Sequence, residues 1–364
     1  MPLARPLYKS PSRALTRGVV RAAADGRGRW ENRMLASYKA LNPVQATWLT
    51  ANPDIEAEFL SRLSSGYLYN TFGPGGQDKS VCDFVMLWTT SGDLGSSSVT
   101  KSGAALRWDI DGAVTVQDNL PAHTKGAGAG IITVSTTDGW AGLTRWETNT
   151  NPLNSPIPAF VGFTSLTHLH LYNTSVTGSV EPLAALTSLT QLYLSSTSVS
   201  GSVEPLAALT SLIYLHLSTT SVSGSVEPLA ALTSLTQLNL SGTLVSGSVE
   251  PLAALTGLTY LNLSGTLVGH GGGSGLNALV AIRDLRIDNC LLTQTEVDNV
   301  LADIYAGRAG YTYATPVLYL GGNNAAPSGT YADEDPPTTG NGYKYELVND
   351  PESDGFNPWT ITSN

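Results

Sequence analysis

The stretch that decides the fold runs from Phe163 to Ala278 and contains five tandem copies of one repeat: FTSLTHLHLYNTSVTGSVEPLAA, LTSLTQLYLSSTSVSGSVEPLAA, LTSLIYLHLSTTSVSGSVEPLAA, LTSLTQLNLSGTLVSGSVEPLAA and LTGLTYLNLSGTLVGHGGGSGLNA. The step is 23 residues, and only the last copy is longer, by one. Repeats of this length stack as coils, because one unit cannot bury its apolar face alone. The period therefore predicts a solenoid for the middle of the chain.

The pattern inside one copy predicts a short strand. Leu192 and Leu194 alternate with Gln191, Tyr193 and Ser195, as a strand with one buried face requires. The other apolar positions are expected to fill the interior of the coil: Leu186, Leu189, Val199, Val203, Leu206 and Leu209.

The skeleton LxxLxLxxTxVxGxVxxLxxL resembles the leucine-rich repeat family in its form ending GxIP. The resemblance implies a position at which the family places Asn to bond the turning backbone, and Thr and Cys are accepted substitutes there. Counting that position outward predicts seven coils from about Leu143 to Leu292, with a worn first coil. The chain has at this position Asn151, Thr174, Thr197, Thr220, Thr243, Thr266 and Cys290.

Composition indicates a globular chain of two or three domains, with 364 residues, 41% of them hydrophobic and only 13% charged. The net charge of -10 hides an asymmetry. Residues 1–39 hold nine basic and two acidic residues, a balance of +7, so the remainder carries -17. Such an arm can contact nucleic acid, an anionic membrane or an acidic protein. Because it lacks nucleic-acid-binding motifs, we expect it to dock on protein. Its docking residues are Arg5, Lys9, Arg13, Arg17 and Arg21.

Several classes of protein are disfavoured. No stretch approaches the ~18 apolar residues of a membrane span, and the N-terminus lacks the apolar core of a secretory signal, so we expect synthesis in the cytoplasm and no membrane insertion. Two cysteines form no disulfide framework and no metal site. The nucleophile and zinc motifs of hydrolases are missing. We therefore expect no enzyme activity, no metal and no cofactor, and we expect the run GHGGGSG (269–275) to be a flexible turn.

The chain is divided into four predicted parts. Residues 1–75 form a basic extended arm with short helices at Trp30–Leu41 and Asp54–Leu63; 76–140 form a small β domain; 141–292 form the solenoid; and 293–364 form a cap of a helix and strands. Thr293 and Glu296 match a capping box, so a helix is expected to start there and cover the last coil.

The β domain has short apolar runs, CDFVMLWTT, ALRWDI, AVTVQ and GIITVSTT, that predict strands. It resembles a PKD-type β-sandwich, a spacer and interaction module. The expected fold is therefore mainly β with short helices, a leucine-rich repeat solenoid preceded by a β-sandwich-like domain and an extended, partly helical arm. The likeness depends on Trp108, Asp109, Asp111, Gly112, Pro121, His123 and Thr124.

The candidate binding site is the concave strand face. The second and third copies differ at only four positions, all between 190 and 196 or their equivalents. Aromatic rings beside amides and imidazoles suit a glycan or a protein loop. The alternative is that these residues are simply polar and drift freely. The expected ligand-binding residues are His168, His170, Tyr172, Gln191, Tyr193, Tyr214, His216, Gln237, Asn239, Tyr260, Asn262 and Arg286.

A stripe of Glu-Pro pairs admits two interpretations. Four stacked carboxylates can gather cations, but we favour Glu and Pro opening a short helical turn, with each carboxylate in water. Asp109-Ile-Asp111-Gly112 offers too few oxygen ligands for calcium. The stripe consists of Glu181, Glu204, Glu227 and Glu250.

The functional hypothesis is a non-enzymatic surface protein of a virion, from a tailed phage. The stretch LARPLYKSPSRALTRGVVRAA resembles the Pro/Arg/Ser-rich starts of phage tail-associated proteins. This resemblance implies other virion proteins as partners of the arm, and a host glycan or protein as partner of the solenoid; a homo-oligomer is compatible with it. The alternatives are a cellular leucine-rich repeat adhesin or interaction protein, and an enzyme acting on host polysaccharide.

Overall fold

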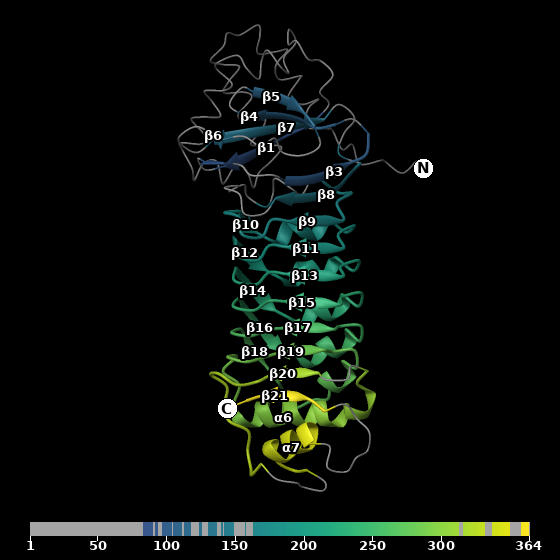
Figure 1. Ribbon diagram of the computed structural model, residues 1–364, viewed down its shortest axis with the longest axis vertical. Coiled ribbons are helices and arrows are strands. Elements are labelled where there is room, and N and C mark those ends of the chain that lie inside the picture. The colour runs from purple at the N-terminus through teal and green to yellow at the C-terminus, as the bar shows by residue number, and fades with distance from the viewer. Residues whose placement is uncertain are drawn as a thin grey trace, which may run out of the picture. The chain divides into compact units, whose positions relative to one another are not determined.

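The computed structural model describes residues 83–89, 92–93, 97–103, 105–110, 113–117, 124–125, 130–136, 140, 142–148, 157, 163–312, 316–331, 337–349 and 358–363. The chain divides into two compact units (Figure 1). The first takes in residues 1–165 and 174–176, and the second takes in 166–173 and 177–364. The predicted docking arm and its two helices lie outside the described residues.

The first unit contains an antiparallel sheet in the order β1-β7-β4-β5. Its four strands confirm the four apolar runs: β1 (Asp83–Thr89), β4 (Arg107–Ile110), β5 (Ala113–Val116) and β7 (Gly130–Thr136). Two further antiparallel pairs join β2 (Gly92–Asp93) to β6 (Thr124–Lys125) and β3 (Ser97–Lys101) to β8 (Leu143–Thr148). The repeat pattern assigns the residues of β8 to a degenerate first coil. It does not predict that β8 pairs with the antiparallel strand β3.

Three aromatic side chains pack together among the described residues of this unit. Trp146 lies between Trp108 and Phe163, with ring centroids 5.7 and 5.5 Å away, and all three are fully buried. The indole of Trp108 donates a hydrogen bond of 2.9 Å to the carbonyl of Gln117, so its polar edge is satisfied inside the core.

The second unit is the predicted solenoid, mainly β with short helices, and this part of the fold is confirmed (Figure 1). One parallel sheet contains β9 (His168–His170), β11 (Gln191–Tyr193), β13 (Tyr214–His216), β15 (Gln237–Asn239), β17 (Tyr260–Asn262), β19 (Asp284–Arg286), β20 (Val317–Tyr319) and β21 (Thr360–Thr362). A second contains β10 (Thr177–Ser179), β12 (Ser198–Ser202), β14 (Ser221–Ser225), β16 (Leu244–Ser248) and β18 (Leu267–Gly269). Short 3-10 turns follow the second set: η2 (Glu181–Ala185), η3 (Glu204–Ala208), η4 (Glu227–Ala231), η5 (Glu250–Ala254) and η6 (Leu276–Ala278).

Buried leucines stabilise these short strands. In β11 and β13 the central Leu192 and Leu215 pair with each other and are fully buried, whereas the residues on either side are partly exposed. Burying one leucine contributes about 1.5–3 kcal/mol. The same register runs from coil to coil, so each leucine packs on the previous one and on the next.

A buried hydroxyl closes each turn after the strand. Thr197 donates a hydrogen bond of 2.6 Å to the carbonyl of Leu194, and Thr220, Thr243 and Thr266 repeat this bond. Cys290, which is a free thiol, instead donates to the carbonyl of Leu263 at 3.2 Å. Thr and Cys therefore occupy the predicted Asn position, which satisfies backbone groups that would otherwise be buried unpaired.

The sheet continues beyond Leu292, where the repeat pattern predicts its end. Strand β20 pairs with β19, and β21 pairs with β20, both in parallel. These strands escape the 23-residue count because α6 (Gln294–Ala306), η7 (Arg308–Gly310) and α7 (Gly340–Asn349) lie between them in the sequence. The sequence correctly predicts strands in this region but does not place them in the solenoid sheet.

Helix α6 starts as predicted. Thr293 is its N-cap, and the capping box with Glu296 is complete. The helix packs against η6 and α7 through a buried apolar side. Its buried apolar residues are Val297, Val300, Leu301 and Ile304.

Candidate binding face of the repeat sheet

The sheet of β9 to β21 places the varied side chains in columns. His168 pairs with Gln191, Gln191 with Tyr214, and the column continues through Gln237, Tyr260 and Asp284. Adjacent strands lie about 4.7–4.9 Å apart, so each outward residue lies beside its equivalents in the neighbouring coils. We call this surface the ladder face: the outward residues of β9, β11, β13, β15, β17 and β19.

An aromatic cluster occupies the N-terminal half of the ladder face. The ring of Tyr193 lies edge-on to His170 at 4.4 Å and to His216 at 4.6 Å, and it stacks on Tyr214 at 6.4 Å. His168 adjoins His170 at 6.0 Å. Tyr193 therefore lies at the centre of five contiguous rings, a low-entropy apolar platform of the kind found in recognition surfaces.

Burial shifts the pKa of two rings in this cluster. Burial raises the pKa of Tyr193, and the neighbouring Tyr214 adds to the effect. Burial lowers the pKa of His216, His170 lowers it further, and a hydrogen bond with Gln237 only partly opposes them. A neutral imidazole offers one donor and one acceptor, and a phenol offers both.

Amides complete the hydrogen-bonding surface. The ring nitrogen Nε2 of His170 lies 3.0 Å from Gln191 Oε1, which fixes both side chains. Asn239 Oδ1 accepts from the backbone and the hydroxyl of Ser241 at 3.1 and 2.9 Å. Asn262 Nδ2 donates to the hydroxyl of Tyr260 at 3.1 Å. These bonds hold the side chains in place before any ligand arrives, which lowers the entropy lost on binding.

The C-terminal end of the ladder face carries a closed ion pair. Arg286 donates two hydrogen bonds, of 2.8 and 2.7 Å, to the carboxylate of Asp284. Those bonds raise the pKa of Arg286, so its charge is permanent. Its guanidinium also lies 4.5 Å from the ring centroid of Tyr319 and 5.9 Å from that of Tyr260. Tyr319 lies on β20 and extends this surface beyond the ladder face, and the repeat pattern does not reveal it.

Burial separates the predicted ligand-binding residues into two groups. His170 and Asn262 are buried, at 5% and 8% exposure, so they support their neighbours rather than offer free surface. The rest are partly exposed: His168, Tyr172, Gln191, Tyr193, Tyr214, His216, Gln237, Asn239, Tyr260 and Arg286. Their role in binding stays a prediction.

The Glu stripe departs from the interpretation favoured above. Each carboxylate accepts a backbone N–H from the following coil: Glu181 Oε1 from Ser202 at 3.1 Å, and Glu204 Oε1 from Ser225 at 3.0 Å. Glu227 and Glu250 repeat the contact with Ser248 and Gly273. The side chains are therefore clamps between coils rather than free groups in water. The expected Pro is present near the start of each of the turns η2 to η5.

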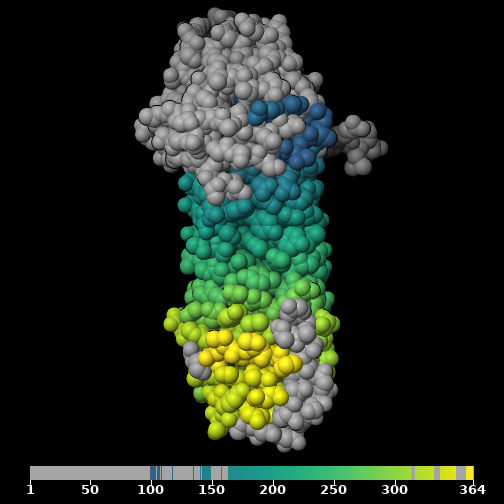
Figure 2. Space-filling model, in the orientation of Figure 1, coloured from purple at the N-terminus to yellow at the C-terminus, as the bar shows by residue number. Residues whose placement is uncertain are grey.

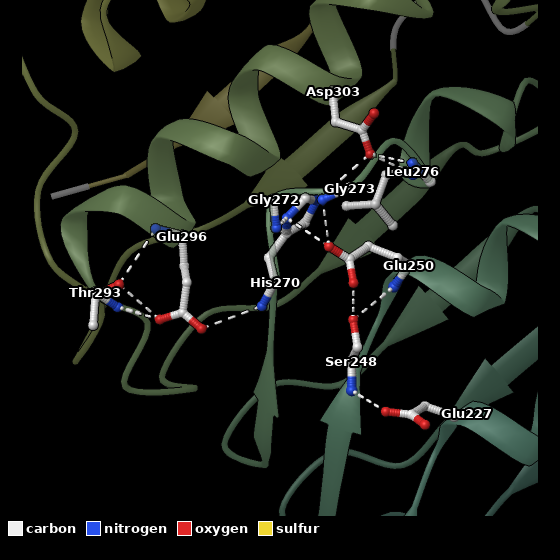
Figure 3. A network of polar contacts seen from close by, with 11 residues as sticks. Glu227, Ser248, Glu250, His270, Gly272, Gly273, Leu276, Thr293, Glu296 and Asp303 are labelled. Atoms are coloured by element: carbon white, nitrogen blue, oxygen red, sulfur yellow. Dashed lines mark hydrogen bonds and ion pairs between the residues drawn. The ribbon is translucent and has the colours of Figure 1, made fainter.

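The glycine-rich run 269–275, expected to be a flexible turn, is held by three carboxylates (Figure 3). Glu250 accepts from the N–H of Gly273 at 2.8 Å, and Asp303 accepts from that of Gly275 at 2.8 Å. Glu296 accepts from the N–H of His270 at 3.3 Å. Because Asp303 and Glu296 belong to α6, these bonds fasten the helix to the last regular repeat.

The side chain of His270 fills the centre of this network and is 1% exposed. Its Nδ1 accepts from the N–H of Gly272 at 3.2 Å and lies 3.5 Å from Glu250 Oε1. Its Nε2 lies 3.5 Å from Asp303 Oδ2. Within the described ranges, no three His, Cys, Asp or Glu side chains are grouped so as to hold a metal ion. We interpret the network as structural because its bonds join the run 269–275 to α6.

The part of the chain that the structure describes also contains no helix long and apolar enough to cross a membrane.

Comparison with known proteins gives a partial family match. Residues 164–208 match the model for leucine rich repeats, described as two copies. No curated protein matches the sequence. The solved structures with a similar fold include a TDR receptor, at 19% identity and a TM-score of 0.41, over 49% of this chain and 32% of that one.

Two other solved structures are similar to part of the chain. The ectodomain of the Arabidopsis receptor kinase HAESA, in complex with an IDA peptide hormone, is 23% identical, with a TM-score of 0.40 over 49% of this chain and 30% of that one. An internalin from Listeria monocytogenes is 23% identical, with a TM-score of 0.35 over 47% and 52%. In all three, the match covers less than two thirds of the other chain.

The family match and the coil-to-coil register agree. The matched residues include β9 and β11, and the strands as far as β19 continue in the same register. The chain therefore contains leucine-rich repeats, and its solenoid continues them in the same register as far as β19.

Proposed function

We propose that the chain is a non-enzymatic binding protein whose ladder face recognises a glycan or a protein loop. The observation that carries the proposal is the cluster of Tyr193, Tyr214 and His216, which joins three rings within 6.4 Å on the variable strand positions. A pre-organised aromatic surface beside fixed amides suits stacking and directed hydrogen bonds.

The proposal includes a virion setting. The basic arm with Arg5, Lys9, Arg13, Arg17 and Arg21 docks onto other proteins of a tailed-phage particle, and the solenoid is displayed on its surface as an adhesin or decoration. What supports it is the charge of +7 on residues 1–39 beside the acidic remainder of the chain. The PKD-like domain acts as a spacer. The alternative is a cellular adhesin, which would use the same ladder face but would not be part of a virus particle.

The ladder face is tested by replacing Tyr193, Tyr214 and His216 together with Ala. Binding is measured on a glycan array and on host cells, with thermal unfolding as the check on folding. A matched control changes Ser198, Ser221 and Ser223 to Ala, on the other sheet of the same coils. We expect the aromatic variant to lose at least tenfold in affinity and the serine variant to lose little. Equal binding by both variants contradicts the proposal.

The arm is tested separately by deleting residues 1–29. The shortened protein is produced together with the products of neighbouring genes, and assembled particles are isolated by density-gradient centrifugation. We expect the deletion to abolish incorporation and to leave ligand binding intact. Normal incorporation, or the absence of any particle containing the full chain, refutes the docking role and favours the cellular adhesin.

A further inference from the structure

A pocket of about 550 Å³ lies in the second unit beside the last strand of the solenoid sheet. Figure 2 shows the side chains of the C-terminal residues, in yellow, gathered on one face of this end. The volume of the pocket falls within the range of binding sites for small molecules. It is lined by Tyr331, Asn341, Lys344, Val348, Pro358, Trp359, Thr360 and Ile361.

The lining combines one cation with an apolar wall. Lys344 Nζ donates 2.7 Å to the hydroxyl of Ser363 and lies 5.7 Å from the ring centroid of Tyr331. No carboxylate of the described residues forms an ion pair with this ammonium. Burial lowers the pKa of Lys344, and a bound anion opposes that effect. Among the described residues, the positive charge at the pocket wall is therefore not matched by a carboxylate.

A second group in the wall lacks a partner. Trp359 is 2% exposed, and its Nε1 has no hydrogen-bond acceptor among the residues the structure describes. Its ring packs edge-on against Tyr311 at 4.9 Å. A buried donor without an acceptor costs free energy, so an oxygen that reached it would be bound favourably.

The remaining polar groups suit hydroxyls. Asn341 Nδ2 donates to the carbonyls of Pro327 and Gly329 at 3.2 and 3.1 Å, which fixes the amide and leaves its Oδ1 as an acceptor. The side chain of Thr360 is exposed at the edge of β21. Tyr331 is 47% exposed on the same wall, and its ring packs edge-on with that of Tyr345 at 5.1 Å. The pocket thus presents a cation, an aromatic platform, a hydroxyl and an amide acceptor together.

We propose that this pocket is a binding site for an acidic sugar. The carboxylate of the sugar pairs with Lys344, the apolar face of its ring lies on Tyr331, and its hydroxyls bond Asn341 and Thr360. An uncharged sugar lacks the group that Lys344 requires, and an aromatic acid lacks the hydroxyls. The site is separate from the ladder face and does not depend on the function proposed for it.

The test titrates the full chain with D-galacturonic acid, D-galactose and benzoate, using saturation-transfer NMR and calorimetry. We expect galacturonic acid to bind at least tenfold more tightly than either other probe, because a charge-assisted hydrogen bond is the strongest kind available here. Equal binding of galactose, equal binding of benzoate, or no binding of galacturonic acid overturns the proposal.

Variants separate recognition from folding. Lys344→Met keeps the apolar stem and is expected to weaken galacturonic acid about tenfold, whereas Lys344→Arg retains most of the affinity. Arg283→Met removes an exposed positive charge elsewhere in the second unit and serves as the matched control. Unchanged affinity in Lys344→Met refutes the site. If Lys344→Met lowers the unfolding temperature, Thr360→Val gives the second test, since it removes only one hydroxyl and is also expected to weaken binding.

Discussion

Replacing Thr219 with Gly is expected to stabilise the second unit. Thr219 has a φ of +56°, in the left-handed region that a β-branched residue rarely adopts. The equivalent residue of the coil before is Ser196, also at +56°, whereas the next two coils have Gly242 at +63° and Gly265 at +68°. The turn therefore requires a left-handed residue in every coil, and two of these coils meet the requirement with glycine.

The magnitude follows from two opposing contributions. A non-glycine residue in the left-handed region costs about 1–2 kcal/mol, and β-branching places Thr219 at the upper end. Glycine loses more backbone entropy on folding, which offsets about 0.5–1 kcal/mol. The net gain expected from Thr219→Gly is therefore about 1 kcal/mol. The side chain of Thr219 is exposed, so the substitution removes little buried surface.

The reverse substitution provides the control. A Cβ added to Gly242 would lie 3.9 Å from the nearest atom, the backbone N of Thr219, which is an ordinary contact. Gly242→Thr thus adds backbone strain without a clash and should lower stability by about 1 kcal/mol. Urea unfolding followed by circular dichroism measures both free energies. If Thr219→Gly lowers the free energy of unfolding, or Gly242→Thr raises it, the strain assigned to this turn is wrong.

Two other perturbations address the C-terminal end of the solenoid. Asn324→Ala should cost about 3 kcal/mol or more, because the buried amide accepts from the N–H groups of Cys290 and Leu292 and donates to two carbonyls. The exposed neighbour Asn323→Ala should cost little, and equal losses in urea unfolding would refute the assignment. Burial tends to raise the pKa of Glu250 and Glu296, but their hydrogen bonds and His270 lower it below the ordinary 4.5. The stability they contribute is therefore present above about pH 4.5 and lost as the pH falls below it. Below that pH, amide hydrogen exchange in α6 should accelerate, and Glu250→Gln should weaken this pH dependence. If the exchange rate, corrected for the intrinsic rate, does not change with pH, the assigned role of the two carboxylates is wrong.

The sequence predicts the solenoid well because one physical rule decides it. Leu192 and Leu215 alternate with polar residues, and no other arrangement buries them in every copy. The rule fails where the period is lost. Asn324 bonds four backbone groups as a leucine-rich repeat asparagine does, yet it follows an insertion and lies outside any 23-residue count. Only the three-dimensional pairing of β20 with β19 reveals that the sheet continues.

The same limit applies to the candidate site. Its columns follow from the period, so Tyr193 and Tyr214 could be placed side by side in advance. Hydrogen bonds between coils could not be predicted. Whether Glu204 reaches water or the N–H of Ser225 depends on the stagger of two strands by a few ångström, which no periodicity encodes. Tyr319 was missed for a related reason, since its strand has no matching repeat.

The positions that stay constant between copies weigh against drift as the source of the variation on the ladder face. Glu204 and Ser202 are unchanged from the second copy to the third, which the clamp between coils explains. Ala208 and Ser211, however, are exposed and equally unchanged, though packing places no such demand on them. Random change would have reached such positions as readily as the strand. All four differences fall at 190–196 and its equivalents, around Tyr193, which is the pattern expected if this surface contacts a partner.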